Sequence, residues 1–184
     1  MARNIEIKAR GTSVDALLPR AQALAGGAAP QLIEQDDSFF HVPQGRLKLR
    51  QFADGSAELI HYHRADTAES KASDYVRVPT PDPAALREAL ARACGLQGRV
   101  RKQRWLLLVG QTRIHLDRVE GLGDFMELEV VLQPEQTDEE GTAIAEALMQ
   151  ALGLAGAERL AGSYLDLLSA AEAKAAGTAS ARKS

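Results

Sequence analysis

The first predicted strand alternates strictly between apolar and polar residues. In residues 4–10 (NIEIKAR), Ile5, Ile7 and Ala9 alternate with polar and charged side chains. Because successive side chains on a β-strand point to opposite faces, this segment has one apolar face and one face with both signs of charge. The pattern recurs in at least three later strands, always with charges two residues apart. The chain must therefore form a sheet with one charged face.

About eight segments have the pattern of strands, and short turns join most of them. Turn residues at 43–45 (PQG) and 54–55 (DG) favour hairpins. Such a series is antiparallel and closes most economically into a barrel or a strongly curved sheet. The helices come singly between strands and at the end, as in an α+β fold. The predicted strands are 4–10, 35–42, 46–52, 58–64, 72–78, 99–109, 113–117 and 125–132, and the predicted helices are 12–24, 82–95, 137–153 and 156–170.

The two faces of these strands have different tasks. The apolar faces are needed to pack the helices, so the helices lie outside and the charged faces point into the lumen of an eight-stranded antiparallel β-barrel, or tunnel. Eight cations and five carboxylates then converge there. They are Glu6, Lys8, Arg10, Lys48, Arg50, Glu58, Arg64, Lys102, Arg104, Arg113, Asp117, Glu127 and Glu129.

So many ionisable groups cannot be buried dry, because each unpaired ion would cost several kcal/mol. The excess of cations favours a polyanion, since lysine and arginine bind phosphate oxygens through charge-assisted hydrogen bonds. The carboxylates would repel that anion unless a divalent metal bridged them, and magnesium and manganese prefer such oxygen ligands. The sequence therefore predicts a cavity for a complex of Mg²⁺ or Mn²⁺ with a triphosphate.

Composition narrows the class of protein further. The 184 residues, 45% apolar and 26% charged, suit one domain, which we place at residues 1–170, with 171–184 as a disordered tail. No apolar run approaches the roughly 20 residues that span a bilayer, and Arg3 is followed by a charged strand rather than a secretory signal. The single cysteine, Cys94, suits a reducing compartment, so a cytoplasmic protein is expected. Nucleic acid is not expected as a partner, because the carboxylates between the cations would repel its backbone.

The ordered motifs resemble those of the CYTH superfamily, which is named for class IV adenylyl cyclases and thiamine triphosphatases and whose members are also called triphosphate tunnel metalloenzymes. Residues 4–8 (NIEIK) are similar to its ExExK opening, with Asn4 in place of the first glutamate. The resemblance covers about residues 3–169 and implies an eight-stranded tunnel with outer helices. The later matching segments are 46–50 (RLKLR), 58–64 (ELIHYHR), 100–104 (VRKQR), 113–117 (RIHLD), 122–129 (LGDFMELE) and 163–168 (SYLDLL).

The resemblance also assigns roles to single residues. It implies that a metal is held by Glu6, Glu127 and Glu129, with Asp117 as a nearby inward-facing acid. Asn4 is a neutral and weaker ligand, which puts a second metal site in question. The residues predicted to bind the triphosphate are Lys8, Arg10, Lys48, Arg50, Arg64, Lys102, Arg104 and Arg113. The residues predicted to take part in catalysis are Lys8, Tyr62 and Asp117.

The function that follows is metal-dependent hydrolysis of a triphosphate: inorganic tripolyphosphate, thiamine triphosphate or a nucleoside triphosphate. Tripolyphosphate is the least demanding substrate, because no aromatic pair is clearly aimed at the tunnel. Tyr62 could stack on a head group, deprotonate water beside a lysine such as Lys71, or simply fill space, and His115 is a further candidate beside Arg113. Two alternatives stay open, a class IV-type adenylyl cyclase and a non-catalytic phosphate-binding module. The protein is expected to be a monomer or a homodimer.

Overall fold

The computed structural model of this chain describes residues 3–10, 13–63 and 74–181. It is an α+β fold built on one eight-stranded sheet in which every neighbouring pair is antiparallel. The strand order is β1-β8-β7-β6-β2-β3-β4-β5. The strands are β1 (Asn4–Arg10), β2 (Gln31–Phe40), β3 (Arg46–Phe52), β4 (Ala57–His63), β5 (Asp74–Pro79), β6 (Leu96–Val109), β7 (Thr112–Val119) and β8 (Gly123–Val131).

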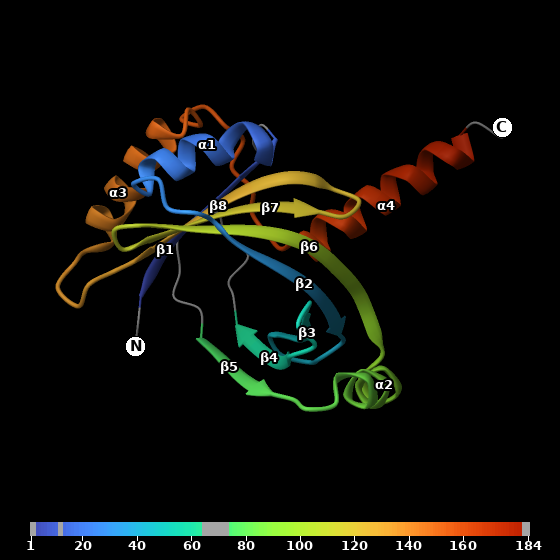
Figure 1. Cartoon of the computed structure of the whole chain (residues 1–184). Coiled ribbons are helices and arrows are strands. Elements are labelled where there is room, and N and C mark those ends of the chain that lie inside the picture. The colour runs from blue at the N-terminus through green and yellow to red at the C-terminus, as the bar shows by residue number, and fades with distance from the viewer. Residues whose placement is uncertain (1–2, 11–12, 64–73, 182–184) are drawn as a thin grey trace.

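Within the described residues, four helices accompany the sheet, and three of them cover parts of its outer face (Figure 1). The helices α1 and α3 lie next to each other over β1, β7 and β8, whereas α2 packs on β2 and β3. The last helix, α4, begins beside β6 and extends away from the sheet (Figure 1). The helices are α1 (Val14–Leu24), α2 (Pro83–Cys94), α3 (Asp138–Ala151) and α4 (Tyr164–Ala181).

The prediction of eight antiparallel strands with outer helices is confirmed, but the sheet is not a closed barrel. Within the described residues, no backbone pairing joins the edge strands β1 and β5. The free edge of β1 is used by another segment instead: Leu160 N donates to Lys8 O at 2.9 Å, and Arg10 N donates to Glu158 O at 3.0 Å. Because Lys8 O and Arg10 N are already paired, these two groups of β1 are not available to β5.

The division between apolar outer faces and charged inner faces is also confirmed. Ile5, Ile7, Ile114 and Leu128 are buried against α1 and α3 in the main core. A smaller apolar group closes one end of the inner face, where Tyr164 and Leu165 at the start of α4 pack with residues of four strands. The strand residues of that group are Phe39, Val100, Val119 and Phe125.

The C-terminal segment differs from the expectation of a disordered tail after residue 170. The helix α4 continues to Ala181. Residues 171–181 (AEAKAAGTASA) contain six alanines, and alanine has the most favourable intrinsic helix propensity. The lack of large apolar side chains therefore did not prevent helix formation here.

Among the described residues, none of the helices combines the length and the apolar composition of a membrane span.

Candidate active site

All eight strands contribute to the wall of one cavity, which has a volume of about 510 Å³. We call this cavity the tunnel. Its volume lies within the range of about 300 to 1,000 Å³ that is usual for small-molecule sites. The segment just before and at the start of α4 adds Ser163 and Tyr164 to the wall.

Most of the residues predicted from the sequence line this tunnel. They are Glu6, Lys8, Lys48, Arg50, Tyr62, Lys102, Arg104, Arg113, Glu127 and Glu129, together with Asn4 and His115. Asp117 lies directly behind the wall, completely buried. Arg10 shares a face with Lys8 but is exposed beyond the end of the tunnel, with its guanidinium 5.0 Å from the Phe125 ring centroid. Arg64 and Lys71 lie outside the described residues.

One group of cations is held by Asp37 on β2, and we call it the Asp37 cluster. Lys48 and Arg50 lie on the neighbouring strand β3 and point to the same face of the sheet as Asp37. Lys48 Nζ lies 2.8 Å from Asp37 Oδ2, and Arg50 binds the carboxylate with Nε and Nη2, both at 2.7 Å. The bidentate arginine contact fixes the plane of the guanidinium. Asp37 was not predicted as a site residue, although it alternates with Gln35 and Phe39 in the way that places all three on the tunnel side.

A second group of cations is held by Asp117 on β7, and we call it the Asp117 cluster. Arg104 on β6 donates from Nε and Nη2 to the two oxygens of Asp117, both at 2.6 Å. Lys102 Nζ and the Tyr164 hydroxyl both reach Asp117 Oδ2 at 2.9 Å. Arg104 Nη2 also reaches Glu127 Oε2 at 2.8 Å, which links this cluster to β8.

The charges of both clusters follow from their partners. Burial alone would raise the pKa of Asp37 and of Asp117, but the adjacent lysine and arginine hold each pKa far below its usual range. Burial lowers the pKa of Lys102 to about 7 and that of Lys48 to about 8. The positive charge of the neighbouring arginines acts in the same direction, and the aspartates offset it only in part. Both lysines can therefore lose their charge near neutral pH.

Tyr164 is buried among the charges of the tunnel and was not singled out by the sequence analysis. Its ring centroid lies 4.6 Å from Lys8 Nζ and 4.9 Å from Lys102 Nζ. Burial, with the carboxylates of Glu127 and Asp117, raises the pKa of the phenol far above its usual value, so the hydroxyl remains a hydrogen-bond donor. The only hint in the sequence is the segment 163–168 (SYLDLL), whose match to the family pattern does not reveal that its tyrosine turns into the tunnel.

The acidic wall is formed by β1 and β8, which pair with Glu6 opposite Glu129. Burial would raise the pKa of Glu127, but Lys8, a hydrogen bond with Glu6, His115 and Arg104 hold it well below its usual value. Lys8 Nζ lies 3.6 Å from Glu127 Oε1.

Glu129 has two partners of its own on this wall. Asn4 Nδ2 donates to Glu129 Oε1 at 2.8 Å, and Arg113 Nη1 lies 3.1 Å from the same oxygen. Asn4 therefore orients one of the predicted metal ligands instead of adding a carboxylate of its own. The wall remains rich in carboxylate oxygens, but it has one carboxylate fewer than a wall with the full ExExK opening would have.

The predicted metal ligands fit magnesium or manganese in chemistry but do not all point to one place. Glu6, Glu127 and Glu129 supply carboxylate oxygens, the donors that these ions prefer, from adjacent positions on two paired strands. Among the described residues, however, no three acidic, histidine or cysteine side chains are already arranged around a common metal position. Asp117 has its oxygens occupied by Lys102, Arg104 and Tyr164, which leaves it a poor candidate for a ligand.

A curled antiparallel sheet that encloses paired lysines, arginines and carboxylates defines an anion-binding tunnel protein. The chain belongs to the CYTH domain family, whose pattern matches residues 2–164. This is a family of triphosphate tunnel enzymes that bind triphosphate substrates. The prediction of the family from the ordered motifs is therefore confirmed.

Solved structures with the same fold span nearly the whole chain. The PH1012 protein from Pyrococcus horikoshii OT3 has 26% sequence identity and a TM-score of 0.78, with 90% of this chain and 99% of that chain covered. A proposed adenylate cyclase from Vibrio parahaemolyticus has 22% identity and a TM-score of 0.70, with 91% and 98% covered. HpAC1 from Hippeastrum, for which a dominant triphosphatase activity is reported, has 15% identity and a TM-score of 0.68, with 92% and 96% covered. No protein of curated function shows significant sequence similarity to this chain.

Proposed function

We propose that this protein is a divalent-metal-dependent triphosphatase that hydrolyses a triphosphate bound in the tunnel. One observation carries the proposal: two lysine–arginine pairs are each held in place by a buried aspartate on the wall of a single cavity. Family membership and the triphosphatase activity reported for HpAC1 give independent support. A hydrolase also needs no group beyond those that bind and orient the phosphates.

The basic residues bind the phosphate chain and offset its charge. Arg50 and Arg104 keep fixed planes, because both guanidinium groups bind their aspartates through two nitrogens. Lys8, Lys48 and Lys102 add point charges from other strands. Preorganised cations of this kind stabilise charge that develops on phosphoryl oxygens without having to reorganise during the reaction.

The acidic wall is the part of the tunnel that would hold the metal. Glu6, Glu127 and Glu129 would be its ligands, and Asn4 would keep Glu129 turned toward Arg113. A divalent ion held there would supply Lewis-acid charge close to the phosphate chain and the attacking water. The cations that pair with Glu127 and Glu129, which are Lys8, Arg104 and Arg113, also line the tunnel and would contact the phosphates.

A specific pair of aromatic residues favours an organic triphosphate as the substrate. Tyr62 on β4 and Tyr75 on β5 are direct cross-strand neighbours, and both line the tunnel. This aromatic pair could not be predicted, because the two residues belong to strands whose pairing the sequence does not reveal. Aromatic faces can stack on a nucleobase or attract a cationic thiazolium ring. Thiamine triphosphate and nucleoside triphosphates therefore remain candidates beside tripolyphosphate.

The test is a substrate panel with each metal. We expect the purified chain with Mg²⁺ or Mn²⁺ to release orthophosphate from tripolyphosphate, and Glu129→Gln to lower kcat by at least about a hundredfold. Glu135→Gln, which changes an exposed acid outside the tunnel wall, is the matched control and should keep its activity. Tyr75→Ala should raise the KM for thiamine triphosphate or ATP and leave the KM for tripolyphosphate unchanged.

Two other outcomes of the substrate panel would each favour a different function. Formation of cyclic AMP from ATP at a rate comparable with hydrolysis would favour a class IV-type adenylyl cyclase. Tight binding of all three triphosphates, without turnover in either metal, would favour a phosphate-binding module.

A further inference from the structure

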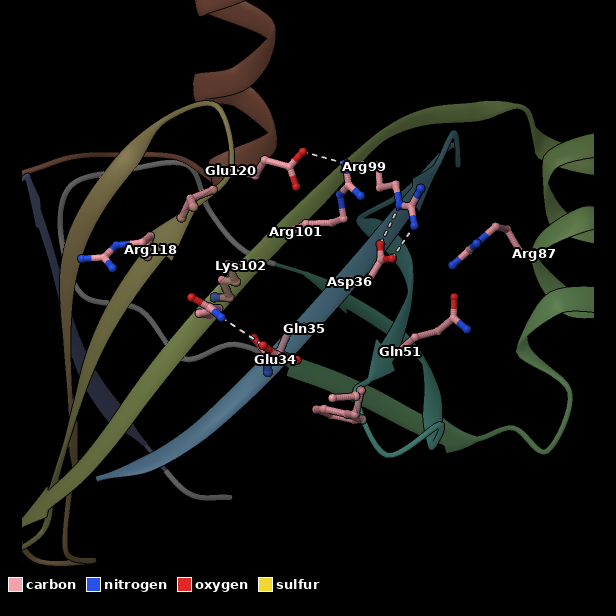
Figure 2. Close-up of a pocket in the computed structure, with 14 residues that line it drawn as sticks. Glu34, Gln35, Asp36, Gln51, Arg87, Arg99, Arg101, Lys102, Arg118 and Glu120 are labelled. Carbon is pink, nitrogen blue, oxygen red and sulfur yellow. Dashed lines mark hydrogen bonds and ion pairs between the residues drawn. The ribbon is translucent and has the colours of Figure 1, made fainter. Parts of the chain in front are cut away.

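A second cavity, of about 690 Å³, lies on the outer face of the sheet. We call it the outer groove. It uses the opposite face of the strands that form the tunnel: on β2, Asp36 faces the groove, whereas its neighbour Asp37 faces the tunnel. Its side chains come from β2, β3, β6, β7 and α2 (Figure 2). None of the roles proposed above involves these outward-facing side chains.

The acids of the groove already have partners on its floor. Arg99 Nε lies 2.7 Å from Asp36 Oδ1, and Arg101 Nη2 lies 2.6 Å from Glu120 Oε1. Glu34 accepts a hydrogen bond from Gln103 at 2.9 Å. These contacts tie together adjacent strands.

Arg87 is the exception among the cations of the groove. Its side chain extends from α2 toward Gln51 and toward the ion pair of Asp36 and Arg99 (Figure 2). Its Nε and Nη2 atoms are buried, and no acceptor within the described part of the chain lies within hydrogen-bond distance of them. Buried donors of this kind are costly unless a partner satisfies them. The fork formed by Nε and Nη2 of a guanidinium matches the two oxygens of a carboxylate or phosphate group.

We propose that the outer groove binds a small organic molecule through a carboxylate or phosphate group that is held by Arg87. The groove is large enough for a metabolite-sized ligand. Four arginines and three acids line it, so the outward-facing side chains carry a small positive excess that suits one anionic group. The amide of Gln51 lies where it can contact the rest of the ligand (Figure 2). The groove shares Gln35, Phe52 and Lys102 with the tunnel lining, but Arg87 lies outside the tunnel, so failure of this proposal would leave the proposed triphosphatase intact.

The test follows the arginine side chain directly. Inorganic phosphate and citrate serve as the phosphate and carboxylate probes, and the Nε–Hε resonances of the full chain are recorded by NMR, with Arg87 assigned through Arg87→Lys. We expect the Arg87 resonance to shift saturably with at least one probe, with a Kd on the order of 1 mM. The resonance of Arg92 should follow only the ionic strength, because this exposed arginine on the same helix is paired with Glu88. An Arg87 resonance that moves no further than in sodium chloride of equal ionic strength would overturn the proposal.

A matched pair of variants provides the second measurement. Arg87→Gln should weaken probe binding at least tenfold, as followed on the resonances of Arg99 and Arg101, whereas Arg92→Gln should not. Hydrolysis of tripolyphosphate should stay within twofold of wild type in both variants, because neither residue lines the tunnel. Undiminished probe binding in Arg87→Gln would also overturn the proposal.

Discussion

The Asp37 cluster and the Asp117 cluster are built on the same plan. Each has a lysine and an arginine two residues apart on one strand, and an aspartate on the next strand that binds both. The spacing of two places both cations on one face, and the antiparallel neighbour brings the carboxylate between them. The lysine–arginine pairs are Lys48 with Arg50 and Lys102 with Arg104.

The two clusters differ in what surrounds the aspartate. Asp117 is 0% exposed and accepts a third hydrogen bond from Tyr164, and Arg104 continues to Glu127. Asp37 is 4% exposed, and its side chain pairs only with Lys48 and Arg50 among the described contacts. The Asp117 cluster is thus connected to the acidic wall, whereas the Asp37 cluster only binds its two cations. A mutation in the Asp117 cluster should therefore affect both the residues that bind phosphate and the predicted metal ligands.

Replacing each aspartate by asparagine should have the largest effect and should separate the two clusters. Breaking a buried ion pair costs roughly 3–5 kcal/mol, and Asp117→Asn removes the carboxylate that binds both Lys102 and Arg104, of which Arg104 keeps only its contact with Glu127. We expect the free energy of unfolding to fall by about that amount and kcat to fall at least about a hundredfold. Asp37→Asn should lower both quantities less, because Glu127 and the acidic wall stay unaffected.

Urea unfolding and steady-state hydrolysis of tripolyphosphate measure both effects. Adding tripolyphosphate should recover part of the lost stability in both variants, since the ligand supplies negative charge to the cations that have lost their aspartate. Equal losses in the two variants, or a larger loss in Asp37→Asn, would contradict the distinction between the clusters.

The pH dependence of ligand binding should show one step for each cluster. Because the pKa is about 7 for Lys102 and about 8 for Lys48, the two lysines lose their charges one after the other as pH rises. Affinity for tripolyphosphate should therefore be highest below pH 7 and fall roughly tenfold with each lost charge, about 1.4 kcal/mol. Lys102→Met should remove the step at lower pH (the lower step), and Lys48→Met should remove the step at higher pH (the upper step).

Calorimetric titration with tripolyphosphate in EDTA, between pH 6 and 9.5, tests this assignment. Without ligand, the unfolded chain keeps these two protons up to about pH 10, so the folded state binds fewer protons and stability should rise with pH above 7. A curve in which Lys48→Met removes the lower step would reverse the assignment of the two clusters.

Local patterns were enough to predict the strands, the face of each charged residue and most of the tunnel. Alternation in segments such as 4–10 and 125–132 depends only on the strand period and on the need to bury one face. The partners of each cation could not be predicted, because the contacts of Asp37 and Asp117 depend on strand pairing and register. The sheet edge was missed for the same reason: residues 158–160 occupy the edge of β1 that a closed barrel would give to β5.

Arg10 and Tyr164 show two further limits of reading the sequence. Arg10 has the parity of Lys8, but parity does not reveal where along the strand the tunnel ends. Tyr164 enters the tunnel because α4 begins beside β6, and Leu165 packs so closely on Gly98 that a Cβ there would lie 2.5 Å from it. Such tertiary contacts leave no periodic signal in the sequence.

Tyr164→Phe should have the smallest effect, and it makes the Asp117 cluster more like the Asp37 cluster. In the Asp37 cluster the ring centroids of Phe39 and Tyr62 both lie 5.5 Å from Lys48 Nζ, and the Phe39 ring has no hydroxyl. Loss of the Tyr164 hydroxyl removes one hydrogen bond to Asp117, worth about 1 kcal/mol, and should lower kcat only severalfold. With one donor fewer, Asp117 becomes a stronger partner for Lys102, so the pKa of Lys102 should rise and the lower step of the binding curve should move toward the upper one. A lower step that stays in place or moves down would mean that the hydroxyl does not set the charge of Lys102.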